Sequence, residues 1–406
     1  YTSTKPDKNF INTYIKDTNI KQSLSKEESN SLNGLLSTEE CTKSIFQMKL
    51  NKSPGLDGLS VEFYREFWDK LKNYAIQSFN YCYKKGMLSE SQKIGLISLI
   101  FKKGDPTELG NYRPITLLNV DVKIIAYTLA QRLKPVMSKI IHSDQNGYIK
   151  NRYIGFNIRQ IQDIIDHAEK LKIDGAILFL DFSKAFDSLE WEFMYQSLTK
   201  FGIENSMLRW VKTLYADIKA CISNNGWISS PLNIFRGIRQ GCPLSAILFV
   251  FAVEILACRI RNDNNLKGIN IKLDGKTHSL IISQLADDTT LFLCSKDEIS
   301  QSFNIIEVFG SLSGLILNRS KTEGLGFGKL KHIQDNFENI NWSKETVKSL
   351  GIHFGYNKSQ CMNLNIEKQL QKSEKILNSW KKRKLTMIGK VTVVKSLVIP
   401  NITYLA

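Results

Sequence analysis

The spacing of apolar and polar residues divides the chain into segments of different expected structure. The first 50 residues are polar, and their apolar positions have the spacing of helices. A helix is expected to begin near Ser37, because a serine three residues before a glutamate, here Glu40, can cap a first helical turn. A loop with one proline and two glycines at 52–58 precedes a further helical pattern that begins at Val61.

The central part of the chain mixes strand and helix patterns. Residues 93–102 and 227–235 have the composition of strands, and 120–141 has that of a long amphipathic helix interrupted near Pro135. The longest apolar run, 244–258, contains a serine and a glutamate and is too short to cross a bilayer. We therefore expect a buried helix there and a soluble protein.

Two strand patterns end in acidic residues. The nearly continuous apolar run 175–182 predicts a buried strand with Asp181 at its polar end, followed by a helix that Ser183 would cap. Farther along the chain, two short β-rich runs flank Asp287 and Asp288 at hairpin spacing. Together with the helical patterns around them, these strands predict an α+β fold.

The net charge of the chain indicates a polyanionic partner. The chain of 406 residues has 55 Lys and Arg against 39 Asp and Glu, a formal charge of +16. Such an excess favours nucleic acid, because phosphate neutralisation releases counterions, although a solvated basic surface is the alternative. The helical segment from about residue 360 carries the basic run 381–384, which suits a duplex backbone or a nuclear import signal equally.

The cysteines indicate the redox compartment of the protein, and the first residue bears on whether the sequence is a fragment. Seven cysteines are scattered without a CxxC pair, which favours a reducing compartment and argues against a structural zinc. The sequence begins with Tyr1 and shows no signal peptide, so we expect a fragment of a longer polyprotein. Its 42% apolar content can build one large multi-lobed enzyme or two to three subdomains.

The acidic residues are candidates for a metal site. Asp181 ends an apolar strand, and Asp287 and Asp288 lie between apolar strands, where a charge is costly unless it is paired or bound to metal. Phosphoryl transfer to a 3′-hydroxyl uses two ions about 3.5 to 4 Å apart, held by carboxylates. An isolated Asp-Asp pair is more often an exposed turn, so the surrounding motifs decide the interpretation.

The order of these motifs resembles the polymerase region of non-LTR retrotransposon reverse transcriptases, in particular the second open reading frame protein of long interspersed elements. The motifs are Phe-Leu-Asp-Phe-Ser-Lys-Ala-Phe-Asp at 179–187, Arg-Gly-Ile-Arg-Gln-Gly-Cys-Pro-Leu-Ser at 236–245 and Ala-Asp-Asp at 286–288. Further segments that resemble the family are 54–58, 111–115, 144–148, 315–322 and 350–352. The resemblance therefore covers almost the whole chain.

The resemblance implies a role for each matching residue. The catalytic set is Asp181, Asp287, Asp288 and Lys321, with Lys321 as general acid toward pyrophosphate and with Asp181, Phe182, Asp287 and Asp288 at the metals. The nucleotide-binding set is Lys102 (or Lys103), Arg113, Phe182, Phe186, Arg239, Gln240 and Gly241, and the primer grip is Leu350, Gly351 and Ile352. Phe186 would exclude a 2′-hydroxyl. A solvated lysine at Lys321, a core phenylalanine at Phe186 and an ordinary strand at 350–352 are the alternatives.

The family also implies an architecture and partners. We expect a right-hand fold with an N-terminal extension and fingers over 1–170, a palm with an antiparallel sheet over 171–356, and the start of a helical thumb over 357–406. The implied activity is RNA-directed DNA polymerase, a nucleotidyltransferase that uses two Mg²⁺ ions, with Mn²⁺ as an alternative. Its partners would be an RNA template, a DNA primer or target and dNTPs, but no membrane. Upstream endonuclease and downstream segments would be missing, and a ribonucleoprotein in nucleus and cytoplasm is expected.

Two positions depart from the family's usual pattern. Leu285 stands where an aromatic residue usually precedes the aspartates, and Ala246 stands where proline is common. These departures leave a second hypothesis open, a catalytically decayed or domesticated copy that binds nucleic acid. A group II intron maturase or an RNA-dependent RNA polymerase is a further alternative, against which Phe186 and the motif at 236–245 argue.

Overall fold

The strand β3 (Gly175–Leu180) is buried along its whole length because both of its faces are covered. The structure is a computed structural model that describes residues 1–273, 276–334 and 336–404. β3 is the middle strand of a five-stranded sheet of order β12-β11-β3-β10-β9 and pairs antiparallel with β10 and β11. The other four strands are β9 (Ile282–Leu285), β10 (Asp288–Leu293), β11 (Glu323–Phe327) and β12 (Asn341–Trp342).

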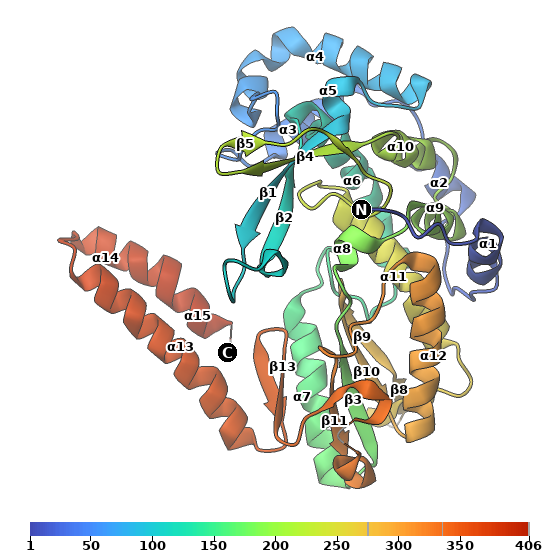
Figure 1. Cartoon of the computed structure of the whole chain (residues 1–406), viewed down its shortest axis with the longest axis vertical. Helices are drawn as coiled ribbons and strands as arrows, with labels where there is room; N and C mark the ends of the chain where they lie inside the picture. Colours follow the sequence, from blue (N-terminus) through green and yellow to red (C-terminus); the bar gives the residue numbers. More distant parts are fainter. Residues whose placement is uncertain (274–275, 335, 405–406) are drawn as a thin grey trace.

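Alternate side chains of this sheet enter two separate hydrophobic cores. Leu178 and Leu291 belong to the larger core, and Ile177 and Phe292 belong to the smaller one. The larger core contains apolar residues of α9 (Trp191–Lys200), α11 (Ser245–Arg261) and α12 (Lys296–Ser313), and the smaller core those of α7 (Ile154–Leu171). Because neighbouring strand residues point to opposite faces, the sheet is the middle layer between these helices (Figure 1).

A second sheet lies above the first in Figure 1, at the other end of the molecule. Its order is β2-β1-β4-β5 with β6 also paired to β4, and β1 runs antiparallel to β2 but parallel to β4. The strands are β1 (Ile94–Phe101), β2 (Tyr112–Leu117), β4 (Lys219–Asn224), β5 (Trp227–Ile228) and β6 (Leu232–Asn233). The β1–β2 hairpin extends from this sheet toward the lower half of the molecule.

Helices surround the second sheet and connect the two halves. They are α1 (Lys8–Lys16), α2 (Lys26–Ser31), α3 (Thr38–Gln47), α4 (Val61–Lys85), α5 (Glu90–Lys93), α6 (Val120–Ile140), α8 (Ala185–Ser188) and α10 (Asn205–Tyr215). The predicted start of α3 is confirmed, since Ser37 and Glu40 form a reciprocal capping box. The predicted interruption at Pro135 is wrong, because α6 continues through it with Leu133 and Val136 buried on either side.

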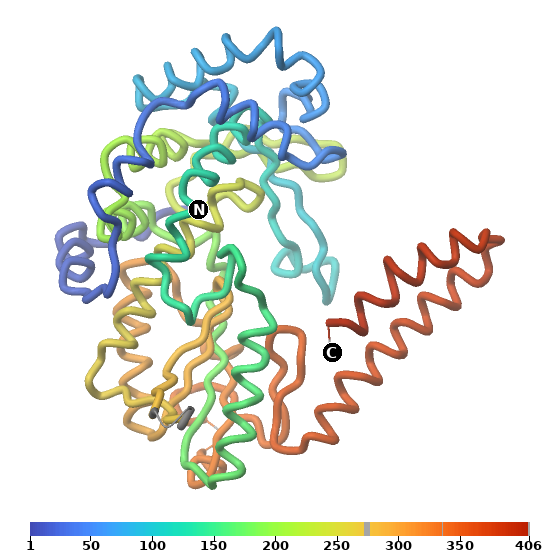
Figure 2. The backbone as a smooth tube through the Cα atoms, turned by 180° about the vertical axis from the view of Figure 1, so that it is seen from behind, coloured from blue at the N-terminus to red at the C-terminus, as the bar shows by residue number. Residues whose placement is uncertain are grey.

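The C-terminal part forms an arm of two antiparallel segments (Figures 1 and 2). It follows the hairpin of β13 (Thr346–Ser349) and β14 (Ile352–Gly355), and consists of α13 (Lys358–Lys381), α14 (Met387–Val393), a π-helical turn (Val394–Val398) and α15 (Ile399–Thr403). The basic run 381–384 lies where α13 ends and the chain turns back. The returning end reaches the β13–β14 hairpin, where the Tyr404 hydroxyl donates to the Leu350 carbonyl.

Two further expectations about local structure differ from what the chain adopts. Ser183 does not cap α8, because the residue at the cap position is Lys184, in a left-handed conformation and without a side-chain cap hydrogen bond. Residues 227–235 form two short strands rather than one, since β5 pairs with Ser223 and Asn224 at one end of β4 and β6 pairs with Lys219 and Ala220 at the other. A separate two-stranded sheet consists of β7 (Ile269–Leu273) and β8 (Lys276–Leu280). None of the helices in the described residues is long and apolar enough to span a membrane.

The larger core predicts the cost of one aromatic truncation. Phe193 on α9 is fully buried and packs edge-to-face on Phe309 of α12, 5.4 Å between ring centroids. We expect Phe193→Ala to lower the free energy of unfolding by about 3–5 kcal/mol, because the change leaves a cavity beside the central sheet. Urea denaturation followed by circular dichroism measures this. Phe10→Ala, at a half-exposed ring on α1, is the control and should cost less than about 0.5 kcal/mol; equal losses would contradict the assigned core.

Candidate active site

The β3–β10 pairing brings the three predicted aspartates to one end of the central sheet. Leu180 is the register partner of Thr289, so the next positions outward are Asp181 on one strand and Asp288 on the other. Asp287 occupies the turn between β9 and β10, directly after Ala286, whose φ of 57° is left-handed. The hairpin tip and the end of β3 therefore place three carboxylates together.

The pKa values of Asp287 and Asp288 are raised above their usual range. Burial and the negative charge of Asp181 raise the pKa of Asp287, and the positive charges of Arg113 and Lys102 partly oppose this. Desolvation, followed by the charges of Asp287 and Asp181, raises the pKa of Asp288 to about 6, although the residue is partly accessible to solvent. Acidic groups with raised pKa values at one site are typical of functional centres.

The donor chemistry of this cluster fits a divalent cation. Among the described residues, the carboxylates of Asp181 and Asp288 accept no hydrogen bond from a side chain, and no three acidic, histidine or cysteine side chains are arranged as a preformed metal site. Hard cations such as Mg²⁺ prefer carboxylate oxygens, and they would relieve the repulsion that raises the pKa values. Phe182, fully buried beside Asp181, offers only its backbone oxygen.

Two predicted cations reach this cluster from the second sheet. Arg113 and Lys102 lie on or beside the β1–β2 hairpin, where Arg113 is the register partner of Ile100. Both influence Asp287 electrostatically, whereas no such contact involves Lys103 in the described part of the chain. The hairpin therefore points positive side chains toward the carboxylates, as a site for a phosphorylated ligand requires.

Phe186 packs against a buried aromatic ring. Its ring is half-buried and stacks on fully buried Phe249 of α11, with 4.6 Å between centroids and an interplanar angle of 11°. The Phe186 carbonyl also accepts a hydrogen bond from the Ile238 amide. The ring is thus fixed between the aspartate strand and the segment 236–241.

That segment packs closely on its neighbours, and glycine permits this. Gly237 has a φ of 86°, and an added Cβ would lie 2.6 Å from the Asp187 carbonyl oxygen. Gly241 has a φ of 115°, and its Cβ would lie 2.6 Å from the Thr116 carbonyl oxygen. Between them the Gln240 carbonyl accepts from the Thr116 amide at 2.7 Å. The segment consequently joins the aspartate strand to the β1–β2 hairpin.

Gln240 is oriented by a carboxylate that the sequence did not single out. Its Nε2 donates to Asp187 Oδ1 at 3.0 Å, and the Tyr1 hydroxyl donates to the same oxygen at 3.2 Å. Burial raises the pKa of Asp187, and these two hydrogen bonds oppose that effect. Arg239 points elsewhere, because its Nη2 donates to the Lys93 carbonyl at 2.9 Å. The structure therefore does not bring Arg239 together with the aspartates.

Lys321 and the segment 350–352 approach the site from two other sides. The Asn318 amide donates to the Asp181 carbonyl at 2.7 Å, and Lys321 is exposed in the turn that Asn318 begins. Residues 350–352 form the β13–β14 turn, with Leu350 at a φ of 50°. Tyr404, bonded to this turn, has a pKa raised by burial and by the charge of Asp288, so the turn is linked to a residue that the cluster influences electrostatically.

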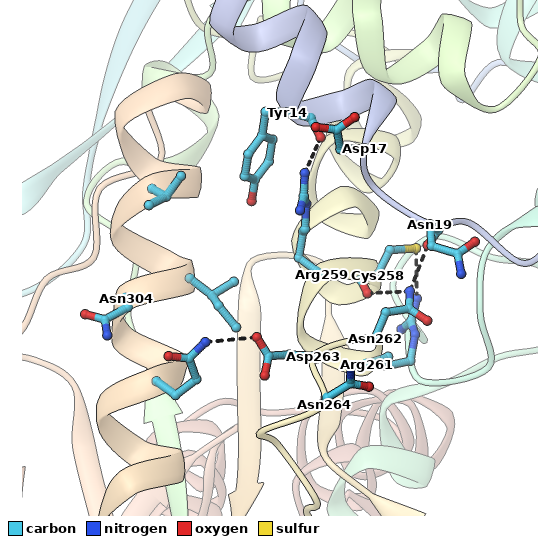
Figure 3. Close-up of a pocket in the computed structure, with 13 residues that line it drawn as sticks. Tyr14, Asp17, Asn19, Cys258, Arg259, Arg261, Asn262, Asp263, Asn264 and Asn304 are labelled. Atoms are coloured by element: carbon cyan, nitrogen blue, oxygen red, sulfur yellow. Dashed lines mark hydrogen bonds between the residues drawn. The ribbon is translucent and has the colours of Figure 1, made fainter.

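A large cavity is separate from this cluster. It measures about 710 Å³ and lies between α1, α11 and α12 (Figure 3). Its polar groups largely satisfy one another, since Gln301 donates to Asp263 and Arg259 donates to the Tyr14 carbonyl. The cavity contains none of the predicted site residues, and we place the chemistry at the carboxylates instead.

Comparisons with known proteins agree with the motif order. The sequence profile of the family described as "Reverse transcriptase (RNA-dependent DNA polymerase)" matches residues 100–354. The uncharacterized 149 kDa protein of transposon TX1 from Xenopus laevis is 32% identical over 373 residues, which is 91% of this chain and 28% of that protein.

Two further relatives come from retrotransposable elements of insects. The retrovirus-related Pol polyprotein of element R2DM from Drosophila melanogaster is 26% identical over 69% of this chain and 25% of its own length. That of element R1 from Bradysia coprophila is 27% identical over 51% of this chain and 20% of its own length. The chain spans about a quarter of the length of these curated relatives.

The repulsion within the cluster predicts a pH-dependent stability. A carboxyl whose pKa is raised on folding destabilises the folded state once it is charged, so the penalty grows from about pH 4 to about pH 6 and is complete above that range. We expect Asp288→Asn to raise Tm by about 2 °C at pH 8 in EDTA, a small shift because the side chain is exposed, and the gain should vanish near pH 4.

Differential scanning calorimetry at pH 4 and pH 8 measures this difference. Asp17→Asn, the same charge change at an exposed residue remote from the cluster, is the matched control and should leave Tm unchanged at both values. A gain of Tm that is independent of pH would contradict the assigned repulsion.

Proposed function

We propose that this chain, which belongs to the reverse transcriptase (RNA-dependent DNA polymerase) family, is the polymerase region of a non-LTR retrotransposon protein and adds deoxynucleotides to a primer 3′-hydroxyl on an RNA template. The observation that carries the proposal is the convergence of Asp181, Asp287 and Asp288 at the end of a buried sheet, opposite Arg113 and Lys102. Family membership alone would not say that this copy keeps its chemical groups.

We infer a right-hand arrangement from the layers described above. The second sheet and its helices, within 1–170 together with 205–233, would be the fingers, the central sheet over 171–356 the palm, and the arm from 357 the start of a thumb. The strands β4 to β6 lie outside the predicted finger range, yet β4 pairs with β1, and β5 and β6 pair with β4. A sequential division of the chain therefore cannot follow these lobes strictly.

The carboxylates would hold the metal ions that such chemistry uses. Asp181, Asp287 and the backbone oxygen of Phe182 would be the inner ligands and Asp288 the peripheral one. When bound, Mg²⁺, or Mn²⁺ in its place, supplies the charge neutralisation that activates the primer hydroxyl and the leaving pyrophosphate. The protein's own part is to hold these oxygens together against their repulsion, as the raised pKa of Asp288 reflects.

The remaining residues would bind and select the nucleotide. Arg113 and Lys102 would contact a triphosphate, for which a guanidinium fork is well suited. Phe186, supported by Phe249, would lie under the sugar and exclude a 2′-hydroxyl, while Gln240 and Gly241 would lie against the nucleotide. Lys321 is exposed near Asp181 and would protonate pyrophosphate.

The nucleic-acid partners would occupy the space between arm, palm and fingers. The turn 350–352 would support the primer end, and the basic run 381–384 at the end of α13 would contact phosphates. An RNA template, a DNA primer or target and dNTPs are the proposed ligands. A ribonucleoprotein shared between nucleus and cytoplasm is the setting that such a function implies.

The proposal predicts loss of synthesis when an aspartate is neutralised. Asp181→Asn or Asp287→Asn should lower incorporation of dTTP on poly(rA)–oligo(dT) with Mg²⁺ by roughly 1,000-fold or more, because the metal ligand set is broken. Fluorescence anisotropy should show primer–template affinity within a few-fold of wild type.

Asp17→Asn serves as the charge-matched control and should polymerise normally. Synthesis at wild-type rates by either aspartate variant would exclude this site. A folded wild type that binds the duplex but makes no product would instead support the decayed or domesticated copy.

The support beneath Phe186 predicts its effect on sugar selection. Phe186→Ala should raise incorporation of rNTPs relative to dNTPs by roughly 10- to 200-fold, because the ring that meets the 2′-hydroxyl is removed. Single-nucleotide extension with dTTP and UTP gives the ratio of kcat/KM values. Phe235→Ala, which removes an exposed ring, is the control. An unchanged ratio of kcat/KM values in the Phe186 variant would refute the proposed role of Phe186 in excluding the 2′-hydroxyl.

A further inference from the structure

We propose that Gln145 is a positioning residue that fixes the turn carrying Asp287 and Asp288, an inference that rests on the proposed function of that site. The Gln145 side chain is fully buried. The Ala286 amide donates to its Oε1 at 2.8 Å, and its Nε2 donates to the Ala286 carbonyl at 3.4 Å. One carboxamide thus pairs with both backbone groups of the residue directly before the aspartates.

The turn needs this partner because of its own conformation. Ala286 has a φ of 57°, a left-handed conformation that is unfavourable for a residue with a side chain. It lies outside the β9–β10 ladder, in which Leu285 and Asp288 are the last pair, so its amide and carbonyl are not paired across the hairpin. An unpaired buried backbone group is costly, and the Gln145 carboxamide removes that cost only while the turn keeps its shape.

The approach of the two segments is too close for any other residue at position 147. A Cβ added to Gly147 would lie 2.4 Å from the Ala286 amide nitrogen. The Gly147 amide also donates to Gln145 Oε1 at 2.8 Å, so this one oxygen accepts hydrogen bonds from two backbone amides. Gln145 and Gly147 therefore form a single contact surface for the turn.

Backbone hydrogen bonds hold this surface in register with β9. The Gln284 amide donates to the Asp144 carbonyl, and the Asn146 amide donates to the Gln284 carbonyl, both at 2.8 Å. The segment 144–146 thereby pairs with the edge strand in a parallel bridge between Gln145 and Gln284. Asn157 of α7 donates to the same Gln284 carbonyl at 3.0 Å. If the segment 144–146 shifted along β9, the Gln145 side chain would no longer lie opposite Ala286.

A buried ion chain anchors this segment to α11. Arg261 donates to Asp144 at 3.1 Å and also pairs with Glu254, which is almost fully buried within the larger core. Arg152 donates to the carbonyls of His142 and Gln145. Because most residues of α11 are buried in the larger core, these contacts tie the position of Gln145 to that core. The Arg261 side chain is visible at the wall of the cavity in Figure 3.

Removing the carboxamide should release the turn without unfolding the protein. Gln145→Ala leaves the Ala286 amide without its acceptor, so hydrogen–deuterium exchange of the peptide covering 285–288 should become faster by roughly 10-fold or more in Mg²⁺-free buffer. Gln145→Glu keeps the accepting oxygen and should retain most of the protection. Gln92→Ala, at another buried glutamine remote from the turn, should leave this exchange unchanged.

The same variants should separate catalysis from binding. Gln145→Ala should lower kcat by roughly 10- to 100-fold, the cost of misplacing reacting groups by a fraction of an ångström to 1 Å. It should also raise the Mg²⁺ concentration at half-maximal rate, with primer–template affinity within about twofold. Gln145→Glu should recover part of kcat, and Gln92→Ala should change neither parameter.

Gly147→Ala provides a second route to the same turn if Gln145→Ala does not fold. It leaves the carboxamide in place but forces a Cβ against the Ala286 amide, and it should show the same faster exchange. Unchanged exchange at 285–288 in Gln145→Ala and Gly147→Ala would overturn the proposal, as would faster exchange with wild-type kcat. The exchange measurement needs no polymerase activity, so an inactive wild type would refute the proposed function and leave the contact with Ala286 testable.

Discussion

The repulsion among Asp181, Asp287 and Asp288 is the constraint around which the rest of the structure is organised. Burial and the neighbouring negative charges raise the pKa values of Asp287 and Asp288, and the three carboxylates would separate if the backbone allowed it. The backbone does not allow it, because β3 is buried on both faces and pairs with β10 through five register positions. The free energy that holds the site together comes from the apolar layers on each side of the sheet.

Polar backbone contacts from distant segments fix the site's finer geometry. Asn318 bonds to the Asp181 carbonyl, Ile238 to the Phe186 carbonyl, and Gln145 to Ala286. Each contact places one sequence motif against another, and glycines at the closest approaches leave room for it. The motifs are therefore held close in space by bonds to one another's main chain.

Much of the fold was readable from the sequence because it depends on local pattern. The buried strand at 175–180, the hairpin before and after Asp287, the capping box at Ser37 and the apolar helix α11 each follow from a run of neighbouring residues. The motif order also indicated the family, and the family profile confirms it over 100–354. Ser183 is not the cap because α8 begins one residue later than expected, after Lys184 in a left-handed conformation, and Pro135 does not break α6 because residues on both sides of it are buried in the core.

The sequence by itself determined which chemical groups the protein carries and on which elements they stand, since periodicity and motif spacing are properties of neighbouring residues. Only the tertiary structure decided which of those groups meet. It brought Arg113 to the carboxylates and turned Arg239 away toward the Lys93 carbonyl, although both are arginines in matching motifs. It also selected Gln145 and Asp187, whose partners lie 141 and 53 residues away. Such contacts depend on how separate elements pack, and no local pattern encodes them.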